Sequence, residues 1–215
     1  MSVSPPQKRP STLLDVLTLA LPVVVTELGW VTMGLVDTLV VGRLGAEALG
    51  GVGLGNILFF TVAIFGMGLL LGLDTVVSQA FGAAQGPGDA IPSLDQCRVW
   101  LIHGIVLAVA GSVPLFFLLR FSIALLPELA LEPAVLQIVI PYMEISSWGV
   151  LPLLLFAAFR RYLQATSIVR PIAGTILAAN VLNLGAASTL VFGFGPIPAL
   201  GTDGSAWATL SHESS

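Results

Sequence analysis

Charged residues are scarce in this sequence, cysteine occurs once, and basic residues are outnumbered by acidic ones. Charged residues occupy 9% of the 215 positions and hydrophobic residues 56%, whereas a soluble domain carries about 25% charged residues. The single cysteine, Cys97, excludes a disulfide within the chain. The formal net charge of −4 argues against a nucleic-acid partner, because such proteins present a basic surface. The composition predicts an integral membrane protein in contact with lipid.

Sequence patterns typical of enzymes are also missing. There is no glycine-rich phosphate loop followed by lysine, which argues against direct use of ATP. No histidine or cysteine cluster has the spacing of metal ligands. The string Ser211-His212-Glu213 is too short and unsupported to count as a Ser-His-acid grouping, and no other is suggested outside the apolar runs. We therefore expect no enzyme activity, no cofactor and no metal site.

Long apolar runs dominate what is present. A helix needs about 20 apolar residues to cross a hydrocarbon core of about 30 Å. Residues 204–210 also look like the beginning of a sixth helix. The predicted fold is an all-α membrane protein with connections at residues 82–98, 127–133 and 159–170, and with five full spans at residues 20–46, 49–79, 99–121, 134–158 and 171–192.

Two glycine pairs in the second run have a spacing of four residues, Gly51 with Gly55 and Gly68 with Gly72. Small residues at this spacing let membrane helices approach closely. Glycine is also generally frequent in membrane helices, so each pair is equally compatible with chance.

The distribution of basic residues predicts a cytoplasmic N-terminus. Segments on the N-terminal side of the membrane would then hold six of the eight, and those on the opposite side two. Short cytoplasmic segments carry such an excess of lysine and arginine. The inner set is Lys8, Arg9, Arg98, Arg160, Arg161 and Arg170, with the two consecutive arginines at the membrane surface, and the outer set is Arg43 and Arg120.

The first run combines a proline, Pro22, with a carboxylate, Asp37. A carboxylate within a membrane costs a few kcal/mol and usually has a function, such as binding and releasing a proton or cation. Proline removes a backbone donor and can bend the helix. A helix that bends and carries a titratable group suits an ion-coupled transporter, although a structural hydrogen-bonding role for Asp37 is also possible.

Other polar and aromatic residues are candidates for a substrate cavity. Glu27 would line the cavity or face another helix, and Glu144 would line it or pair with a residue such as Arg160. Trp148 could stack on a flat cation or serve in packing, and Tyr142 could hydrogen-bond in the cavity. Asp74 would act as a gate or as a cap near the end of the second helix.

Five strings, in their order and spacing, resemble the multidrug and toxic compound extrusion (MATE) transporters. They are ALPVVVTELGWVTMGLVDTLVVGRLGAEALGGVGLG, GLDTVVSQAFGA, FRRYLQATSIVRP, ANVLN and PALGTDGSAWATL. The resemblance covers residues 13–210. It implies half of a twelve-helix antiporter that exports cationic or amphipathic drugs and metabolites in exchange for H⁺ or Na⁺, in a bacterial inner membrane.

On this resemblance, residues 1–12 form a cytoplasmic tail and residues 13–210 an N-terminal six-helix lobe with an incomplete sixth helix. Residues 211–215 form a polar tail. The chain is then expected to be truncated, and its partner would be a missing C-terminal lobe or a second copy. Asp37 matches the acid implicated in cation coupling in the first helix, and Asn180 and Asn183 match asparagines of the fifth.

Three functions remain open. They are a drug antiporter, a flippase for lipid-linked sugars from the same superfamily, and a non-transporting scaffold or remnant. A flippase should have a basic cavity for pyrophosphate. The acids Asp37, Glu27 and Glu144, with no arginine or lysine predicted in mid-span, favour a small cationic substrate.

Overall fold

The computed structural model describes residues 13–84 and 90–166, and a set of positions nearer the C-terminus: 174, 175, 178, 180–182, 184, 185, 189–191, 201, 202, 204 and 207. The elements are helices α1 (Leu13–Gly42), α2 (Ala46–Ala84), α3 (Ala90–Leu125), η1 (Leu126–Leu129), α4 (Pro133–Ser147) and α5 (Val150–Ala165). No strand occurs among the described residues, so the predicted all-α class is confirmed.

Three stretches are long and apolar enough to cross a membrane: Val23–Gly42, Ala46–Ala83 and Asp95–Leu129. Helices α4 and α5 qualify as a fourth span only when taken together, with a bend of 51° between them. The fifth predicted run, residues 171–192, lies largely outside the described residues, and its described positions are helical. The described part of the chain therefore supports three or four of the five predicted spans.

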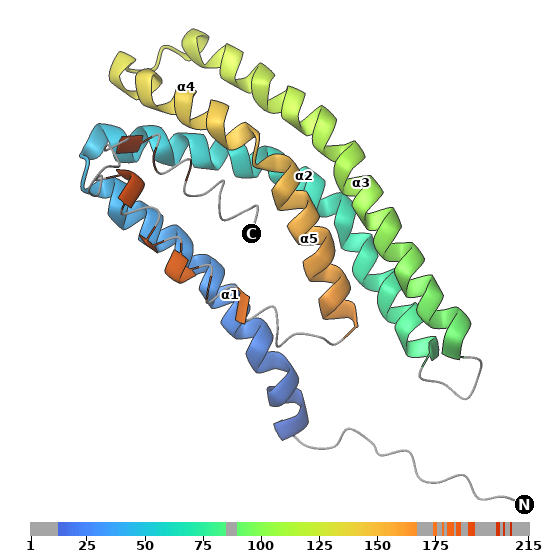
Figure 1. Cartoon of the computed structure of the whole chain (residues 1–215). Helices are drawn as coiled ribbons and strands as arrows, with labels where there is room; N and C mark the ends of the chain where they lie inside the picture. Colours follow the sequence, from blue (N-terminus) through green and yellow to red (C-terminus); the bar gives the residue numbers. More distant parts are fainter. Residues whose placement is uncertain are drawn as a thin grey trace, which may run out of the picture.

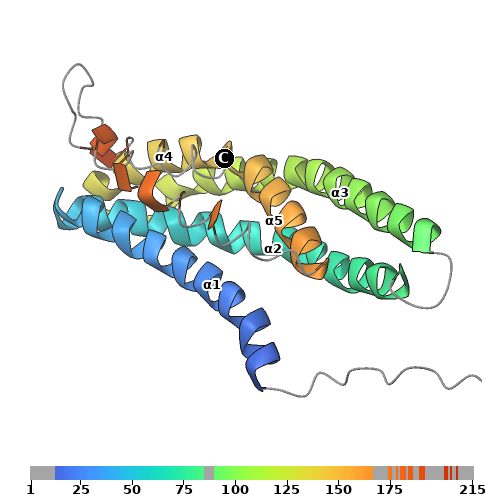
Figure 2. The ribbon, with the colours of Figure 1, turned by 60° about the horizontal axis from the view of Figure 1, so that its bottom comes forward.

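Helix α2 is the centre of the bundle and contacts α1, α3, α4 and α5 (Figure 1). Its face of Phe59, Ala63, Leu70 and Val77 is buried in the main apolar core. Helix α1 precedes α2, and the turn between them contains Gly45 with a φ of +115°, a conformation that favours glycine. From that turn α1 diverges from the bundle towards its N-terminal end (Figures 1 and 2).

The first glycine pair marks a close helix contact. A Cβ atom on Gly51 would lie 2.6 Å from Ile138, and one on Gly55 would lie 2.6 Å from Tyr142, so α4 packs directly against the α2 backbone. A Cβ on Gly68 or Gly72 would meet no described atom within 4 Å. Only the first spacing thus marks close packing within the described residues.

The predicted fourth span is broken rather than continuous. Trp148 and Gly149 donate backbone hydrogen bonds to residues three positions back, at 3.2 and 2.8 Å, in place of the α-helical pattern. Pro152 explains the break, because it has no N–H for the carbonyl of Trp148 and its ring crowds that carbonyl. The chain consequently turns by 51° between α4 and α5.

Two connections are shorter in the structure than predicted, because helices extend into them. The connection at residues 82–98 is wrong at both ends, because α2 continues to Ala84 and α3 begins at Ala90. Pro92 is tolerated there because the N–H groups of a first helical turn have no intrahelical acceptor. The connection at residues 159–170 is also wrong in its first half, since α5 continues through helix-forming residues to Ala165.

Candidate functional site: a charged cavity between α1, α2 and α5

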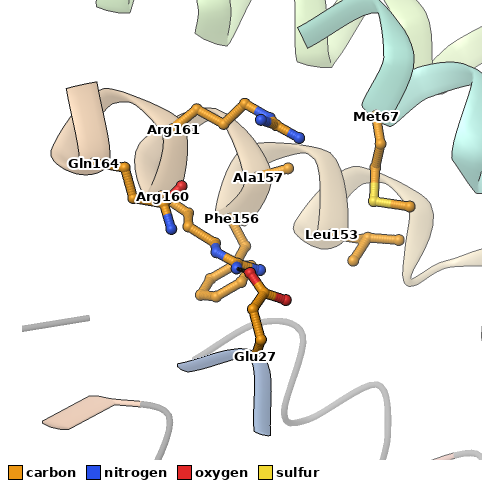
Figure 3. Close-up of a pocket in the computed structure, with 8 residues that line it drawn as sticks. All are labelled: Glu27, Met67, Leu153, Phe156, Ala157, Arg160, Arg161 and Gln164. Atoms are coloured by element: carbon orange, nitrogen blue, oxygen red, sulfur yellow. Dashed lines mark hydrogen bonds and ion pairs between the residues drawn. The ribbon is translucent and has the colours of Figure 1, made fainter. Parts of the chain in front are cut away.

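A cavity of about 290 Å³ lies between α1, α2 and α5 (Figure 3). Most of its lining comes from α5 at positions separated by three or four residues, which is the spacing of one helix face. Helix α1 contributes a carboxylate and α2 a thioether. The lining residues are Glu27, Met67, Leu153, Phe156, Ala157, Arg160, Arg161 and Gln164.

Glu27 and Arg160 form an ion pair across this cavity, from the Nη2 atom of the guanidinium to Oε1 of the carboxylate. The Arg160 side chain is 16% exposed, whereas that of Glu27 is 59% exposed. Glu27 therefore lines a cavity and also contacts another helix, and the use of this cavity by a substrate stays a prediction. Arg160, predicted for a surface connection, instead lies in α5 and points to α1 (Figure 3).

Arg161 pairs with Asp74 of α2, from Nη1 to Oδ2. Consecutive helical residues point about 100° apart, so Arg160 and Arg161 reach different neighbours. Asp74, expected near a helix end as a gate or cap, thus joins α2 to α5. The two arginines together connect α5 to both α1 and α2.

Glu144 does not reach this cavity. Its partner is Arg120 of α3, 3.2 Å away, and not Arg160. Both side chains are almost half exposed, at 44% for Arg120 and 47% for Glu144. Glu144 therefore has a partner, as one of the two alternatives expected, but on α3, and its place in a substrate cavity stays a prediction.

Tyr142 and Trp148 are also separate from the charged cavity. Tyr142 is buried in the main core, where its ring packs against Gly55. Trp148 lies at the break before α5 and contacts the ring of Phe116 at a centroid distance of 5.1 Å. It lines a second hollow of about 220 Å³ between α3 and the break. Neither residue lines the cavity of Glu27, and their role in a substrate cavity stays a prediction.

Asp37 is partly buried in the C-terminal half of α1. It lies ten residues from Glu27, which corresponds to about 15 Å along the helix axis. Its neighbours Val36 and Val40 pack with Leu190 and Val191 from the fifth predicted run. Residues 190 and 191 therefore lie against α1 close to Asp37.

Only some of the predicted asparagine and proline positions lie among the described residues. Asn180 is a partly buried helical residue, whereas Asn183 lies outside the described residues. Pro22 falls within the bounds of α1, and its side chain lies outside the described part. A joint site of Asp37, Asn180 and Asn183 stays a prediction.

The ion pairs, and with them the charge balance of the site, were not predicted from the sequence. No arginine was expected in mid-span, yet Arg120, Arg160 and Arg161 all lie within helices. Each is paired with an acid, so the excess of negative charge that favoured a cation is largely neutralised at Glu27, Asp74 and Glu144. The sequence does carry a signal that places Arg160 in a helix, because Phe156, Arg160 and Gln164 are four residues apart and so share one helix face.

Comparison with known proteins adds an independent line of evidence. The MatE family model matches residues 22–188. A protein of Deinococcus radiodurans named "Probable multidrug resistance protein NorM" is 34% identical over 195 residues, which is 91% of this chain and 42% of that protein. One of the same name from Rhodopseudomonas palustris is 32% identical, over 92% of this chain and 40% of the relative.

Solved structures show the same fold. An outward-facing multidrug resistance MATE family transporter of the MOP superfamily superposes with a TM-score of 0.71 at 19% identity, over 91% of this chain and 41% of that one. A MOP superfamily transporter from Pyrococcus furiosus, described as having a binding pocket of reverse polarity, gives 0.70 at 20% identity over the same shares. The chain spans about 40% of the length of the relatives it matches. Because the family model matches most of its length, the protein belongs to the MatE family of integral membrane transporters.

Proposed function

We propose that this chain is the N-terminal lobe of a secondary antiporter, which exports cationic or amphipathic compounds in exchange for H⁺ or Na⁺. The family match supports the transporter class, and the names of the relatives support drug export. The observation that carries the proposal is a partly polar cavity with an accessible carboxylate, Glu27, among helices long and apolar enough to cross a membrane.

Asp37 is the proposed coupling residue, assisted by Asn180 and Asn183. Its partial burial in α1 supports this role, because a carboxylate away from water changes its affinity for a proton or cation when its surroundings change. The contact of α1 with residues 190 and 191 supports a shared site with the fifth run. Pro22 would allow α1 to bend as the occupancy of Asp37 changes.

The substrate cavity we propose is narrower than the sequence suggested. It includes Glu27, with Met67 and Phe156 as apolar contacts, and omits Tyr142, Glu144 and Trp148. A missing C-terminal lobe or a second copy would complete the transporter. This division into a lobe at residues 13–210 with short polar tails also remains part of the proposal.

The proposed location is a bacterial inner membrane with a cytoplasmic N-terminus. Because Arg160 and Arg161 are paired inside the bundle, they no longer count as surface residues. The remaining basic residues of the predicted inner segments are Lys8, Arg9, Arg98 and Arg170, against Arg43 and Arg120 outside. The excess is smaller and still favours the same orientation.

The test is ion-driven export of ethidium in liposomes by the full-length transporter that contains this lobe. Asp37→Asn should abolish coupled transport, because the amide cannot exchange a proton or balance a cation. Thr38→Ala is the matched control, since Thr38 is an exposed neighbour that bonds only its own helix, 2.7 Å to the carbonyl of Gly34. Full coupled transport by Asp37→Asn would contradict the proposal.

A lipid-linked sugar flippase is the second candidate, and one observation favours it. Arg160 and Arg161 both line the cavity, where a pyrophosphate could bind. Their pairing with Glu27 and Asp74 opposes such binding, because each guanidinium already has a carboxylate partner. Competition of ethidium export by a lipid-linked pyrophosphate, with no competition by organic cations, would favour the flippase.

A further inference from the structure

We propose that Glu27 is the binding group for an organic cation and that Arg160 is its resident counter-ion, which the incoming cation displaces. The displacement releases the N-terminal half of α1 from α5. This inference rests on the proposed function, since it assigns the group that recognises the cationic substrate.

The two ends of α1 are held in different ways. The C-terminal end is fixed by apolar packing, with Val40 and Val41 buried. The N-terminal half exposes an apolar stripe, buries Thr26, and meets α5 through Glu27 and Arg160. Among the described residues α1 and α5 share almost no packing contact. Loss of the ion pair would therefore remove the described link between this half of α1 and α5, and leave the apolar packing at the other end in place.

The geometry of the Glu27–Arg160 pair favours replacement of Arg160 by a ligand cation. The Glu27 carboxylate is 59% exposed, so a ligand in the cavity reaches it without prior movement of the helices. Arg160 is mostly covered, and within the described residues its buried Nε atom has no hydrogen-bond acceptor. A partly unsatisfied guanidinium holds its partner less strongly than one paired through both of its edges.

The remaining lining suits an amphipathic cation. Phe156 offers an aromatic face and Met67 an adaptable apolar side chain next to the carboxylate. A cation bound beside Arg160 would place two positive charges on one carboxylate, so binding requires that Arg160 move away. Gln164, one turn further along α5, presents an amide oxygen that can receive the displaced guanidinium.

A second interhelical ion pair provides a built-in control. Arg120 and Glu144 connect α3 to α4, and neither residue lines the cavity of Glu27. Arg120→Gln removes one positive charge and leaves a carboxylate without its partner, as Arg160→Gln does, but away from Glu27. Its effect separates the specific exchange at Glu27 from a general change in the charge of the protein.

The experiment measures binding of tetraphenylphosphonium to the full chain in lipid nanodiscs, with empty nanodiscs as the blank. Glu27→Gln should weaken binding at least about tenfold, because the counter-charge is lost. Arg160→Gln should tighten binding about tenfold, because the competitor is lost. Arg120→Gln should stay within about twofold of the unmodified chain, since Arg120 pairs with Glu144 and does not line the cavity of Glu27.

Spin labels report the movement independently of affinity. Labels on Leu21→Cys in α1 and Phe159→Cys in α5, both exposed positions, are introduced with Cys97→Ser as background. The distance between labels should lengthen on addition of tetraphenylphosphonium, and should be long in Arg160→Gln without it. A distance that is the same in all three states overturns the proposal.

Opposite signs of the two affinity changes are the decisive result. Tighter binding by Arg160→Gln cannot come from misfolding, which keeps the test valid if Glu27→Gln proves unstable. Unchanged or weaker binding by Arg160→Gln, or unchanged binding by Glu27→Gln, overturns the exchange and leaves the antiporter proposal standing. Absence of tetraphenylphosphonium binding in the unmodified chain and in every variant overturns both.

Discussion

Helices α2 and α4 meet through close apolar packing, whereas α1 and α5 meet through an ion pair. In the first, glycine in α2 brings the backbone against Ile138 and Tyr142, and no charge is involved. In the second, two helices with little packing are joined by the Glu27–Arg160 ion pair beside a cavity. A close-packed contact transmits force as a rigid unit, whereas an ion pair next to a cavity can exchange partners. On the proposal above, the α2–α4 contact stays together while the α1–α5 contact opens.

The largest loss of stability is expected in the packed region, from Leu119→Ala. Leu119 is 1% exposed, and its neighbour Leu118 is 44% exposed. Truncation of a buried leucine leaves a cavity and destabilises by about 2–5 kcal/mol. The lower end applies here, because a lipid environment removes most of the hydrophobic contribution. Thermal unfolding in detergent should show a large fall for Leu119→Ala and little change for Leu118→Ala; equal effects would show that α3 is not packed as described.

The next effect tests the glycine contact directly. Gly51→Ala should destabilise by about 1–3 kcal/mol, because its Cβ would overlap Ile138 and force α2 and α4 apart. Gly53→Ala, two residues away with no atom in reach, should be neutral or stabilise by up to about 1 kcal/mol through helix propensity. The measurement is again the melting temperature, and the same sign for both variants would refute the contact.

The ion pairs should contribute less to stability than the packed contacts, and the more buried pair should contribute more than the exposed one. A double-mutant cycle on Arg161→Gln and Asp74→Asn should give a coupling energy of about 1 kcal/mol, because both side chains are largely covered. The cycle on Arg98→Gln and Asp95→Asn should give about 0.3 kcal/mol or less, since that pair is 3.9 Å apart and mostly exposed. A stronger coupling for the exposed pair would contradict the described positions of α2 and α5.

The smallest change in stability is expected at the bend between α4 and α5. Pro152→Ala supplies the N–H that the carbonyl of Trp148 lacks, so the two helices should straighten with a change in stability below about 1 kcal/mol. Spin labels at Gln137→Cys and Phe159→Cys, with Cys97→Ser, should then move apart. Leu151→Ala is the control because it leaves the backbone pattern intact; an unchanged distance in Pro152→Ala would assign the bend to another cause.

The comparison also shows why some expectations from sequence succeeded. Membrane character follows from the sum of residue hydropathies over a run, which needs no knowledge of neighbouring helices. The Gly51–Gly55 spacing found a real contact because both glycines lie on one face of a single helix. The assignment of Arg160 and Arg161 failed because the end of α5 was placed too early, and boundaries are the least certain part of such reasoning.

The amino-acid sequence alone determined that the protein is helical, that it belongs in a membrane, and where its family resemblance lies, because each follows from local runs and strings. Only the tertiary structure decided which arginine neutralises which acid, that Glu144 pairs with Arg120, and that Tyr142 and Trp148 do not line the cavity of Glu27. These outcomes depend on the rotation of each helix about its axis and on the bend at Pro152, and a change of one residue in register turns a side chain by about 100°.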